Sequence, residues 1–383
     1  MTGGDTKSQY FGPIWEKILE ELDKVNKKYN VPVKLAIVGF AKSGKSTLFN
    51  AIYGEDVQEV GAQTDLTMED RDARRFGVIL TDTRGFGTSL VPLQEIKSKI
   101  AEDPPHMIIH CINGMGGISE DDAELYEFCK EAGKHVIVVV TKADVMKERE
   151  IAEFRRSVQE KLDSSVDPLF VSAETALNMT ILVKKVVSLL PEAARDAFIA
   201  KQRVDFQAKR NKSRAAIQTT ALAAAGVAVS PIPVSDVLIL IPMQAGMVAA
   251  IGKLWGYEMS AARVKEIITV AGGGIVLRYA FQVLVKFLPA AGSIIGPVIA
   301  YGGTVALGEA ALRYFESGMK ATPEEIAKVY KQAKEKAEHG FKTSGREDKI
   351  EQHKDELEQL RRQLERGGIT QEEYERRVEE LLG

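Results

Sequence analysis

Cysteine is scarce in this chain: Cys111 and Cys129 are the only two among 383 residues. Two cysteines cannot build a disulfide scaffold, and they suit the reducing cytosol. The five histidines are scattered, and no group of residues has the spacing of metal ligands. The first residues, 1–5, lack the basic and then apolar layout of a signal peptide. These absences predict a cytoplasmic protein without a disulfide framework.

The chain also lacks an excess of either charge. Lys and Arg number 51 against 54 Asp and Glu, which gives a net charge of −3 and a pI near 6.1. A general nucleic-acid binder needs a basic surface, so this balance counts against that class. A hydrophobic content of 45% with 27% charged residues is ordinary for a globular protein. At 383 residues, we expect two or three domains.

A glycine-bounded loop stands between a predicted strand and a predicted helix. Residues 33–39 are mostly apolar, and residues 46–52 follow as a helix. The loop between them has the G-x-x-x-x-G-K-[ST] spacing and reads Gly39-Phe40-Ala41-Lys42-Ser43-Gly44-Lys45-Ser46. Its glycines let successive N–H groups point at an anion, and the helix N-terminus adds partial positive charge. We expect Lys45 to reach the β- and γ-phosphates of a nucleotide and Ser46 to bind Mg²⁺.

A second apolar strand, residues 76–82, ends in a carboxylate at Asp82. Such a residue lies at the edge where ligands of parallel sheets bind, so we expect Asp82 to hold Mg²⁺ through water. The Gly85 amide is expected to donate to the γ-phosphate. The polar segment 60–68 should supply one hydroxyl to Mg²⁺. Spacing favours Thr67 for this role and leaves Thr64 as the alternative.

Two further motifs select the base. Residues 136–140 are consecutive apolar residues that lead into Thr141-Lys142-Ala143-Asp144, and Val171-Ser172-Ala173 follows later. The Asp144 carboxylate can accept the N1–H and 2-amino donors of guanine. Adenine lacks this donor pair, so binding of adenine would leave the buried Asp144 carboxylate without hydrogen-bond donors, which disfavours adenine. The stem of Lys142 can lie against the base, and the Ala173 N–H can donate to guanine O6.

Four motifs in this order resemble the translation-factor-type P-loop GTPases, particularly the Era-like and immunity-related GTPases, over residues 33–190. The resemblance implies an α/β Ras-like domain with a mostly parallel sheet that binds GTP or GDP with Mg²⁺. We assign catalytic roles to Lys45, Thr67 and Gly85, and metal binding to Ser46, Thr67 and Asp82. The expected nucleotide contacts are Gly39, Ala41, Lys42, Ser43, Gly44, Lys45, Ser46, Thr47, Thr141, Lys142, Asp144, Ser172 and Ala173.

Four positions bear on the resemblance and on the mechanism that it implies. Many relatives place a Gln that orients water after the second motif, whereas Phe86 stands here and cannot hydrogen-bond water. We therefore expect slow intrinsic hydrolysis unless a partner, a second protomer or another loop positions the nucleophile. Lys42 could act as a cation near the developing negative charge or be a solvated surface lysine. Arg84 could act as a cation on the phosphates within the same chain or be a flexible switch side chain, and Thr141 stands where Asn is commoner.

Composition changes after residue 190. Residues 191–214 are net basic and predict a solvated helix, although anionic lipid would also attract such a segment. Residues 215–235 and 237–252 are uncharged. The helical arm expected in each of these two runs has about 15 residues, which is too short to span a bilayer. A third uncharged run, residues 287–308, is long enough to span one. This region is either a packed helical domain or a hydrophobic hairpin able to contact membrane. It resembles the YcjF-type domain of unknown function, which is generally regarded as membrane-associated.

The predicted organisation therefore has four parts. These are a helix in 1–32, a GTPase domain in 33–190, an all-α domain in 191–345 and a helical hairpin in 346–383, which resembles a SHOCT-like module. We expect residues 340–345 to form the linker before this hairpin. The expected function is GTP hydrolysis coupled to a membrane-associated helical domain. The alternative is a soluble regulatory GTPase that binds a protein partner. The sequence leaves open whether the protein attaches to the inner face of a membrane, peripherally or integrally. It also leaves open whether the protein forms homo-oligomers that depend on nucleotide, and which partner it binds.

Overall fold

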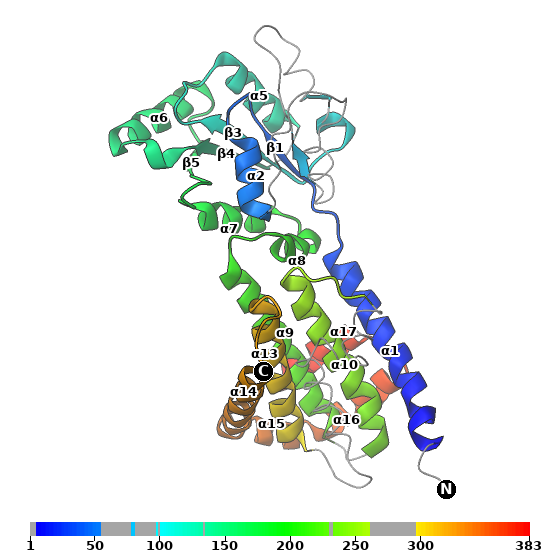
Figure 1. Ribbon diagram of the computed structural model, residues 1–383. Helices are drawn as coiled ribbons and strands as arrows, with labels where there is room; N and C mark the ends of the chain where they lie inside the picture. Colours follow the sequence, from blue (N-terminus) through cyan, green and yellow to red (C-terminus); the bar gives the residue numbers. More distant parts are fainter. Residues whose placement is uncertain are drawn as a thin grey trace. The chain divides into compact units, whose positions relative to one another are not determined.

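The chain folds as two compact units in the computed structural model (Figure 1). The sheet unit comprises Asn30–Phe206, and the helical unit combines Met1–Tyr29 with Gln207–Gly383. The structure describes residues 5–54, 78–80, 97–98, 100–132, 135–229, 233–260 and 296–383. The sheet unit ends at Phe206, beyond the predicted boundary after residue 190. The difference is one helix, α8 (Glu192–Lys201), and the turn that follows it.

The sheet unit is built on a parallel sheet with the strand order β2-β1-β3-β4-β5. Because β1 pairs with β2 on one side and with β3 on the other, the direction of winding reverses beside β1. Ligands of such sheets bind at the carboxyl ends of the strands beside this reversal. The strand bounds are β1 Leu35–Val38, β2 Val78–Leu80, β3 Met107–Asn113, β4 His135–Thr141 and β5 Leu169–Phe170.

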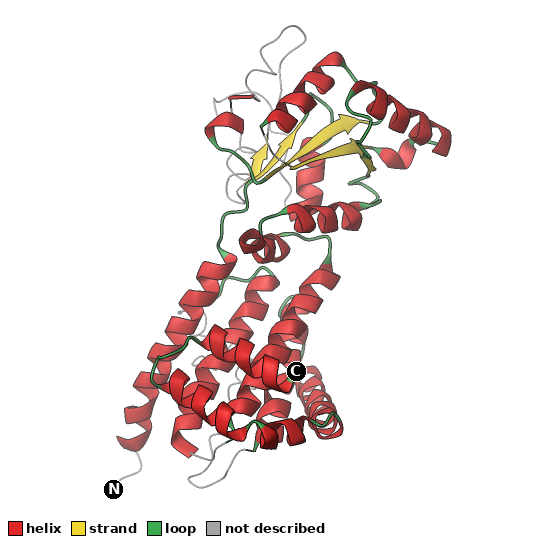
Figure 2. Cartoon of the chain, turned by 180° about the vertical axis from the view of Figure 1, so that it is seen from behind, coloured by secondary structure: helices red, strands yellow, loops and turns green. Residues whose placement is uncertain are grey.

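Helices cover both faces of the sheet (Figure 2), and the alternation of β1 shows why. Leu35 and Ile37 belong to the buried cluster that includes residues of α2, α7 and α8. Ala36 and Val38 point to the other face and pack with residues of α5. Strands covered on both faces are nearly all apolar, as β1 is. The bounds are α2 Lys45–Tyr53, α5 Glu120–Glu131, η1 Ala143–Val145, α6 Glu148–Lys161, α7 Met179–Leu189 and α8 Glu192–Lys201.

The basic segment 191–214 is not the solvated helix that the sequence predicts. It forms α8, a turn and the first part of α9, Phe206–Val227. Ala197 and Phe198 are fully buried in the core of the sheet unit. Lys209 is also fully buried, in the helical unit. Apart from Lys209, the charged side chains of the two helices are exposed or half-buried, while small and aromatic residues between them are buried.

The helical unit contains the remaining described helices. The first helix, α1, contacts α10, so the N-terminal segment packs with the C-terminal half of the chain. Ile18 and Leu22 are buried, and the Asn26 side chain donates to the Met259 carbonyl at 3.1 Å. The bounds are α1 Asp5–Tyr29, α10 Pro233–Leu254, α13 Pro297–Glu316, α14 Pro323–Thr343, α15 Arg346–Gln352, α16 Lys354–Glu365 and α17 Gln371–Leu382.

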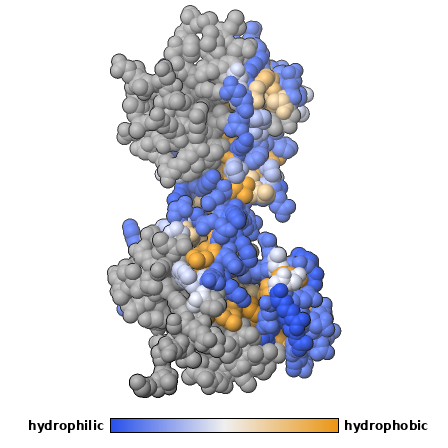
Figure 3. All heavy atoms as spheres, turned by 90° about the vertical axis from the view of Figure 1, so that its right-hand side faces the viewer, coloured by the Kyte–Doolittle hydropathy of each residue, from blue (hydrophilic) through white to orange (hydrophobic). Residues whose placement is uncertain are grey.

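The apolar stretches of the sequence lie largely inside this unit. Helices α9 and α10 have 22 residues each, so they are longer than the predicted arms. Residues 221–227 of α9 are buried, and so are most of residues 239–254 of α10. On the face drawn in Figure 3 the described residues are mostly hydrophilic, with apolar side chains in small groups. No helix in the described ranges is both long and apolar enough to cross a bilayer.

The C-terminal segment docks on the helical unit. Helix α14 runs through Gly340 to Thr343, so the predicted linker at 340–345 is wrong. The segment between α14 and α15 consists of Ser344 and Gly345 alone. Helix α16 ends at Glu365 and α17 begins at Gln371, where the Thr370 hydroxyl caps it by accepting from the Glu373 N–H. The Tyr374 ring is fully buried, and its hydroxyl donates to the Ala223 carbonyl on α9 at 3.4 Å.

Candidate functional site

The loop after β1 has the conformation that the glycine motif requires. Gly39 has φ +145° and Gly44 has φ +84°, and both values are rare for residues with side chains. A Cβ on Gly39 would lie 2.3 Å from the Cys111 carbonyl oxygen, so only glycine fits there. The backbone of Lys42 also has a left-handed conformation, with φ 63°. Helix α2 begins at Lys45, directly after the loop, so the partial positive charge of its N-terminus lies next to the loop.

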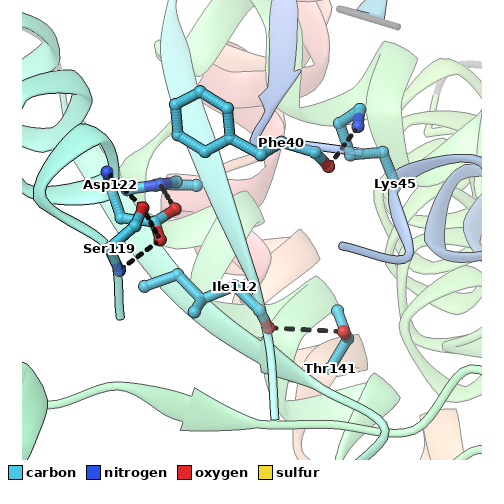
Figure 4. Close-up of polar contacts among 7 residues, drawn as sticks. Phe40, Lys45, Ile112, Ser119, Asp122 and Thr141 are labelled. Atoms are coloured by element: carbon cyan, nitrogen blue, oxygen red, sulfur yellow. Dashed lines mark hydrogen bonds and ion pairs between the residues drawn. The ribbon is translucent and has the colours of Figure 1, made fainter. Parts of the chain in front are cut away.

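Lys45 and Ser43 show how this loop is prepared for a ligand. The Lys45 ammonium is buried and donates to the Phe40 carbonyl at 2.9 Å (Figure 4). The Ser43 N–H donates to the same carbonyl at 3.1 Å, which closes the turn. The Ser43 hydroxyl is buried and has no hydrogen-bond partner within the described residues. A buried hydroxyl without a partner is costly, so this atom fits a site completed by a polar ligand.

Thr141 ties the end of β4 to the loop after β1. Its hydroxyl donates to the Ser43 carbonyl at 2.8 Å and lies 3.3 Å from the Ile112 carbonyl, the contact drawn in Figure 4. Ser43 and Thr141 are 98 positions apart in the sequence. A Cβ on Gly44 would lie 3.1 Å from the Thr141 hydroxyl, so the loop and β4 approach closely. The hydroxyl therefore fixes the loop relative to the strand that precedes Asp144.

The segments after β4 and β5 are joined by backbone hydrogen bonds. The Ala143 N–H donates to the Val171 carbonyl at 3.0 Å, and the Ser172 N–H donates to the Leu177 carbonyl at 3.1 Å. The Ser172 hydroxyl accepts from the Thr175 N–H at 3.2 Å. The bond between Ala143 and Val171 holds the two predicted base-binding motifs together at one edge of the sheet, and the two bonds of Ser172 shape the loop after β5. Asp144 is exposed, so its carboxylate is accessible to a ligand.

The structure brings together the predicted residues that it describes. Those of the phosphate loop share one turn, and those of the base motifs adjoin it through Thr141. Ala41, Lys42, Thr47 and Lys142 are exposed, Gly39, Gly44, Ser46 and Ala173 are buried or half-buried, and Ser43, Lys45, Thr141 and Ser172 are buried. The predictions for Thr64, Thr67, Asp82, Arg84, Gly85 and Phe86 fall outside the described residues.

A buried polar cluster beside β3 was missed by the sequence analysis. His110 on β3 is fully buried, and its Nε2 lies 3.5 Å from a carboxylate oxygen of Asp122 on α5. Asp122 also closes the capping box of α5, because it accepts from the Ser119 N–H and hydroxyl (Figure 4). Burial opposes ionisation of Asp122, but the interaction with the nearby His110 ring and the hydrogen bonds from Ser119 outweigh it and lower the pKa of its carboxyl. The Ser-x-x-Asp spacing could have indicated the cap, but not the histidine.

Neither cysteine has the environment of a reactive thiol. Burial raises the pKa of the Cys111 thiol to about 12, although nearby Lys45 lowers it. Burial likewise raises the pKa of Cys129 to about 12, against a smaller lowering effect of Lys97. Both side chains stay neutral near pH 7 and behave as small apolar groups. The chemistry at the edge of the sheet therefore belongs to the loop, its lysine and its hydroxyls.

The sheet order and the loop after β1 are those of the P-loop GTPase fold. Residues 34–142 match a family model described as 50S ribosome-binding GTPase. Residues 197–339 match a second model, described as domain of unknown function (DUF697). The chain thus combines a P-loop GTPase domain with a helical domain for which that description names no activity.

Curated relatives align with part of the chain. A protein named GTPase Der from Cronobacter sakazakii (strain ATCC BAA-894) is 34% identical over 160 residues, which cover 39% of this chain and 31% of the relative. GTPase Der from Desulforudis audaxviator (strain MP104C) is 28% identical over 212 residues, which cover 52% of this chain and 46% of that relative. The chain therefore spans about a third to a half of the length of these relatives.

One solved structure similar to the chain is the crystal structure of a probable GTP-binding protein engB. It is 21% identical, with a TM-score of 0.32, and covers 41% of this chain and 97% of that chain.

Proposed function

We propose that this protein binds GTP with Mg²⁺ at the carboxyl edge of its sheet and hydrolyses the γ-phosphate. The observation that carries this proposal is the hydrogen-bonded connection of three loops: Ser43 to Thr141, and Ala143 to Val171. A phosphate-binding turn is common to many nucleotide enzymes. Here the same connection holds it beside a Thr-Lys-Ala-Asp segment whose carboxylate matches the donor edge of guanine.

The described residues divide the work of binding. The loop N–H groups and the Lys45 ammonium would neutralise the phosphates, after Lys45 exchanges its bond to the Phe40 carbonyl for phosphate oxygens. The Ser43 hydroxyl would gain the partner that it lacks among the described residues. The Ser46 hydroxyl at the start of α2 would hold Mg²⁺, which supplies positive charge between the phosphates. Asp144 would accept two guanine donors.

The remaining groups complete the proposal from the sequence. Thr67 and Asp82 would assist Ser46 around the metal, and the Gly85 N–H would stabilise the γ-phosphate. Phe86 stands where a water-orienting Gln is common, so unstimulated hydrolysis would be slow.

The test of this activity is single-turnover release of phosphate from GTP. We expect a slow but measurable rate with Mg²⁺ that disappears in Lys45→Ala, whose loss of a charge-assisted contact should weaken GTP binding about 10- to 100-fold. Lys34→Ala is the matched control, because the Lys34 ammonium pairs with Asp103 on the surface. Equal rates in Lys45→Ala and Lys34→Ala would contradict the proposal.

We propose further that the helical unit associates with the surface of a membrane when GTP is bound. Support comes from exposed basic residues early in α9, Arg214 among them, next to a long uncharged segment. Most of that segment is buried in this conformation, so association would use either the basic surface or apolar groups released by a change in packing. The alternative is a soluble regulator whose helical unit binds a protein or a second copy.

Flotation with anionic vesicles separates these alternatives. Protein loaded with a non-hydrolysable GTP analogue is expected to float with vesicles that contain phosphatidylserine, and less so with GDP. Neutral vesicles control for the basic surface. Protein that stays at the bottom of the gradient in all nucleotide states, while its oligomeric state changes with nucleotide, would support the soluble regulator instead.

A further inference from the structure

The turn after α8 is organised by one buried side chain, Gln202. This residue is fully buried, and its amide makes four hydrogen bonds to the backbone around it. The amide nitrogen donates to the Ile199 carbonyl at 3.4 Å and to the Asp205 carbonyl at 2.9 Å. The amide oxygen accepts from the Val204 N–H at 2.6 Å and from the Asp205 N–H at 2.7 Å. A buried amide satisfied in this way rigidifies the segment that it holds.

The same turn is bonded to the helix that follows the phosphate loop. The Arg203 N–H donates to the Ile52 carbonyl in the last turn of α2 at 2.7 Å. Gly54, which ends α2 in the left-handed conformation, leaves room for the stem of Arg203, since a Cβ on Gly54 would lie 2.9 Å from the Arg203 Cγ. Val204 packs against the cluster that contains Phe49 and Ile52 of α2. A displacement at the end of α2 is therefore passed directly to the Gln202 turn.

Helix α9 begins at Phe206, the residue after this turn, and continues into the helical unit. Within that unit, its early residues hold the end of α10. The buried Lys209 ammonium donates to the Leu254 carbonyl at 2.8 Å, and the Trp255 indole donates to the Ser213 hydroxyl at 3.3 Å. A change in the direction or register of α9 would therefore alter the surroundings of Trp255.

We infer that Gln202 is a positioning residue that couples the nucleotide state of α2 to α9 and the end of α10. The inference rests on the proposed nucleotide binding, since Lys45 and Ser46 at the start of α2 are the groups that would contact phosphate and Mg²⁺. Because the turn is braced by four hydrogen bonds, it transmits movement of α2 to the chain that enters α9. A turn without these bonds would absorb the movement by changing its own backbone angles.

The fluorescence of Trp255 tests this coupling. Trp15 and Trp255 are the two tryptophans of the chain and both belong to the helical unit, so Trp15→Phe leaves one reporter outside the sheet unit. In this background we expect the Trp255 emission to differ between GDP and a non-hydrolysable GTP analogue with Mg²⁺. Gln202→Met keeps the side-chain volume but removes the four hydrogen bonds. It should reduce the nucleotide-dependent signal to about half or less.

The control and a separate binding measurement make the result specific. Gln207→Met changes an exposed glutamine whose amide donates to the Asn211 side chain, and it should leave the signal unchanged. Affinity for a fluorescent guanine nucleotide, measured directly, should stay within about twofold in both variants. A full Trp255 signal in Gln202→Met, or no signal in the parent despite nucleotide binding, would overturn the coupling. Absence of binding in the parent would instead overturn the proposed function and remove the basis of the coupling.

A second variant and the parent protein cover the case in which Gln202→Met does not fold. Gln202→Glu retains an acceptor for the Val204 and Asp205 N–H groups but loses at least one of the two donated bonds, so it should also reduce the signal. In the parent, amide hydrogen exchange over residues 203–213 should differ between GDP and the GTP analogue. Identical exchange in the two states would contradict the inference without any substitution.

Discussion

Thr141 shows how a single hydroxyl can connect two loops that bind different parts of one ligand. It donates to the Ser43 carbonyl at 2.8 Å, and it directly precedes the segment that contains Asp144. The bond is buried, so its loss leaves a carbonyl without this partner as well as removing the bond itself. The position of the phosphate loop relative to the base-binding residues therefore depends on this atom.

Thr141→Val removes the hydroxyl with little change of shape. We expect guanine nucleotides to bind about 2- to 10-fold more weakly, which corresponds to the usual net contribution of one hydrogen bond. Isothermal titration with GDP measures the effect. Thr175→Val is the control, because the side chain of Thr175 is exposed and its backbone N–H makes the bond to the Ser172 hydroxyl. Equal affinities for the two variants would show that the hydroxyl does not position the loop.

Asp144→Asn tests the residue that is proposed to choose the base. An Asn side chain would place its NH₂ group opposite one of the two guanine donors. The contact between a carboxylate oxygen and that donor would then be replaced by repulsion between two donors. We expect GTP affinity to fall about 100-fold, while xanthosine triphosphate, which has an oxygen in place of the 2-amino group, gains affinity relative to GTP. Competition against a fluorescent nucleotide gives both values. An unchanged preference for GTP would mean that Asp144 does not contact the base.

At the scale of elements, α13 offers a matched pair of glycines. A Cβ on Gly308 would lie 2.4 Å from Ile217 on α9, whereas a Cβ on Gly303 would meet nothing within 4 Å. Gly303→Ala should stabilise the helical unit by about 0.5–1 kcal/mol through helix propensity. Gly308→Ala has the same propensity gain but overpacks the contact at a cost of about 1–3 kcal/mol, so it should destabilise the unit. Urea unfolding followed by tryptophan fluorescence measures both. A Gly308→Ala variant as stable as Gly303→Ala would contradict this packing.

The elements also show which features the sequence could reveal. The phosphate loop was predictable because its glycines, lysine and serine are contiguous and follow an apolar strand. The bond between Thr141 and Ser43 was not, because it joins residues 98 positions apart. Helix α14 continues through Gly340 because one glycine costs only about 1 kcal/mol in a helix that is held by packing. Buried residues of α8 and the fully buried Lys209 stand among charged neighbours, so local composition alone predicted solvent exposure.

At the scale of the whole molecule, Glu375 makes the stability of the helical unit depend on pH. Burial raises the pKa of this carboxyl on α17 to about 7, against a lowering effect of the Gln371 amide; Glu21 and Glu372 raise it further, and Lys28 lowers it. The folded state therefore binds a proton that the unfolded chain releases at lower pH. Protonated Glu375 therefore contributes to the free energy of unfolding. This contribution is complete below the ordinary pKa near 4.5 and is lost as pH rises through about 7.

Glu375→Gln should remove this pH dependence. We expect the free energy of unfolding of the parent to fall between about pH 4.5 and pH 7 relative to that of the variant. Urea unfolding at a series of pH values, followed by the two tryptophans of the helical unit, provides the comparison. Glu351→Gln, at an exposed position on α15, should change stability little and equally at all pH values. Parallel curves for the parent and Glu375→Gln would contradict the assignment.

The central claim concerns the ligand of the entire sheet unit: a guanine nucleotide with Mg²⁺, held by the loop after β1 and selected by Asp144. Isothermal titration of the full chain with GTP, GDP and ATP tests it most directly. The account predicts one nucleotide per chain for GTP and for GDP, and binding of ATP weaker by about 100-fold, because adenine cannot supply the donor pair that Asp144 accepts. No binding of GTP or GDP, or equal affinity for ATP, would contradict it.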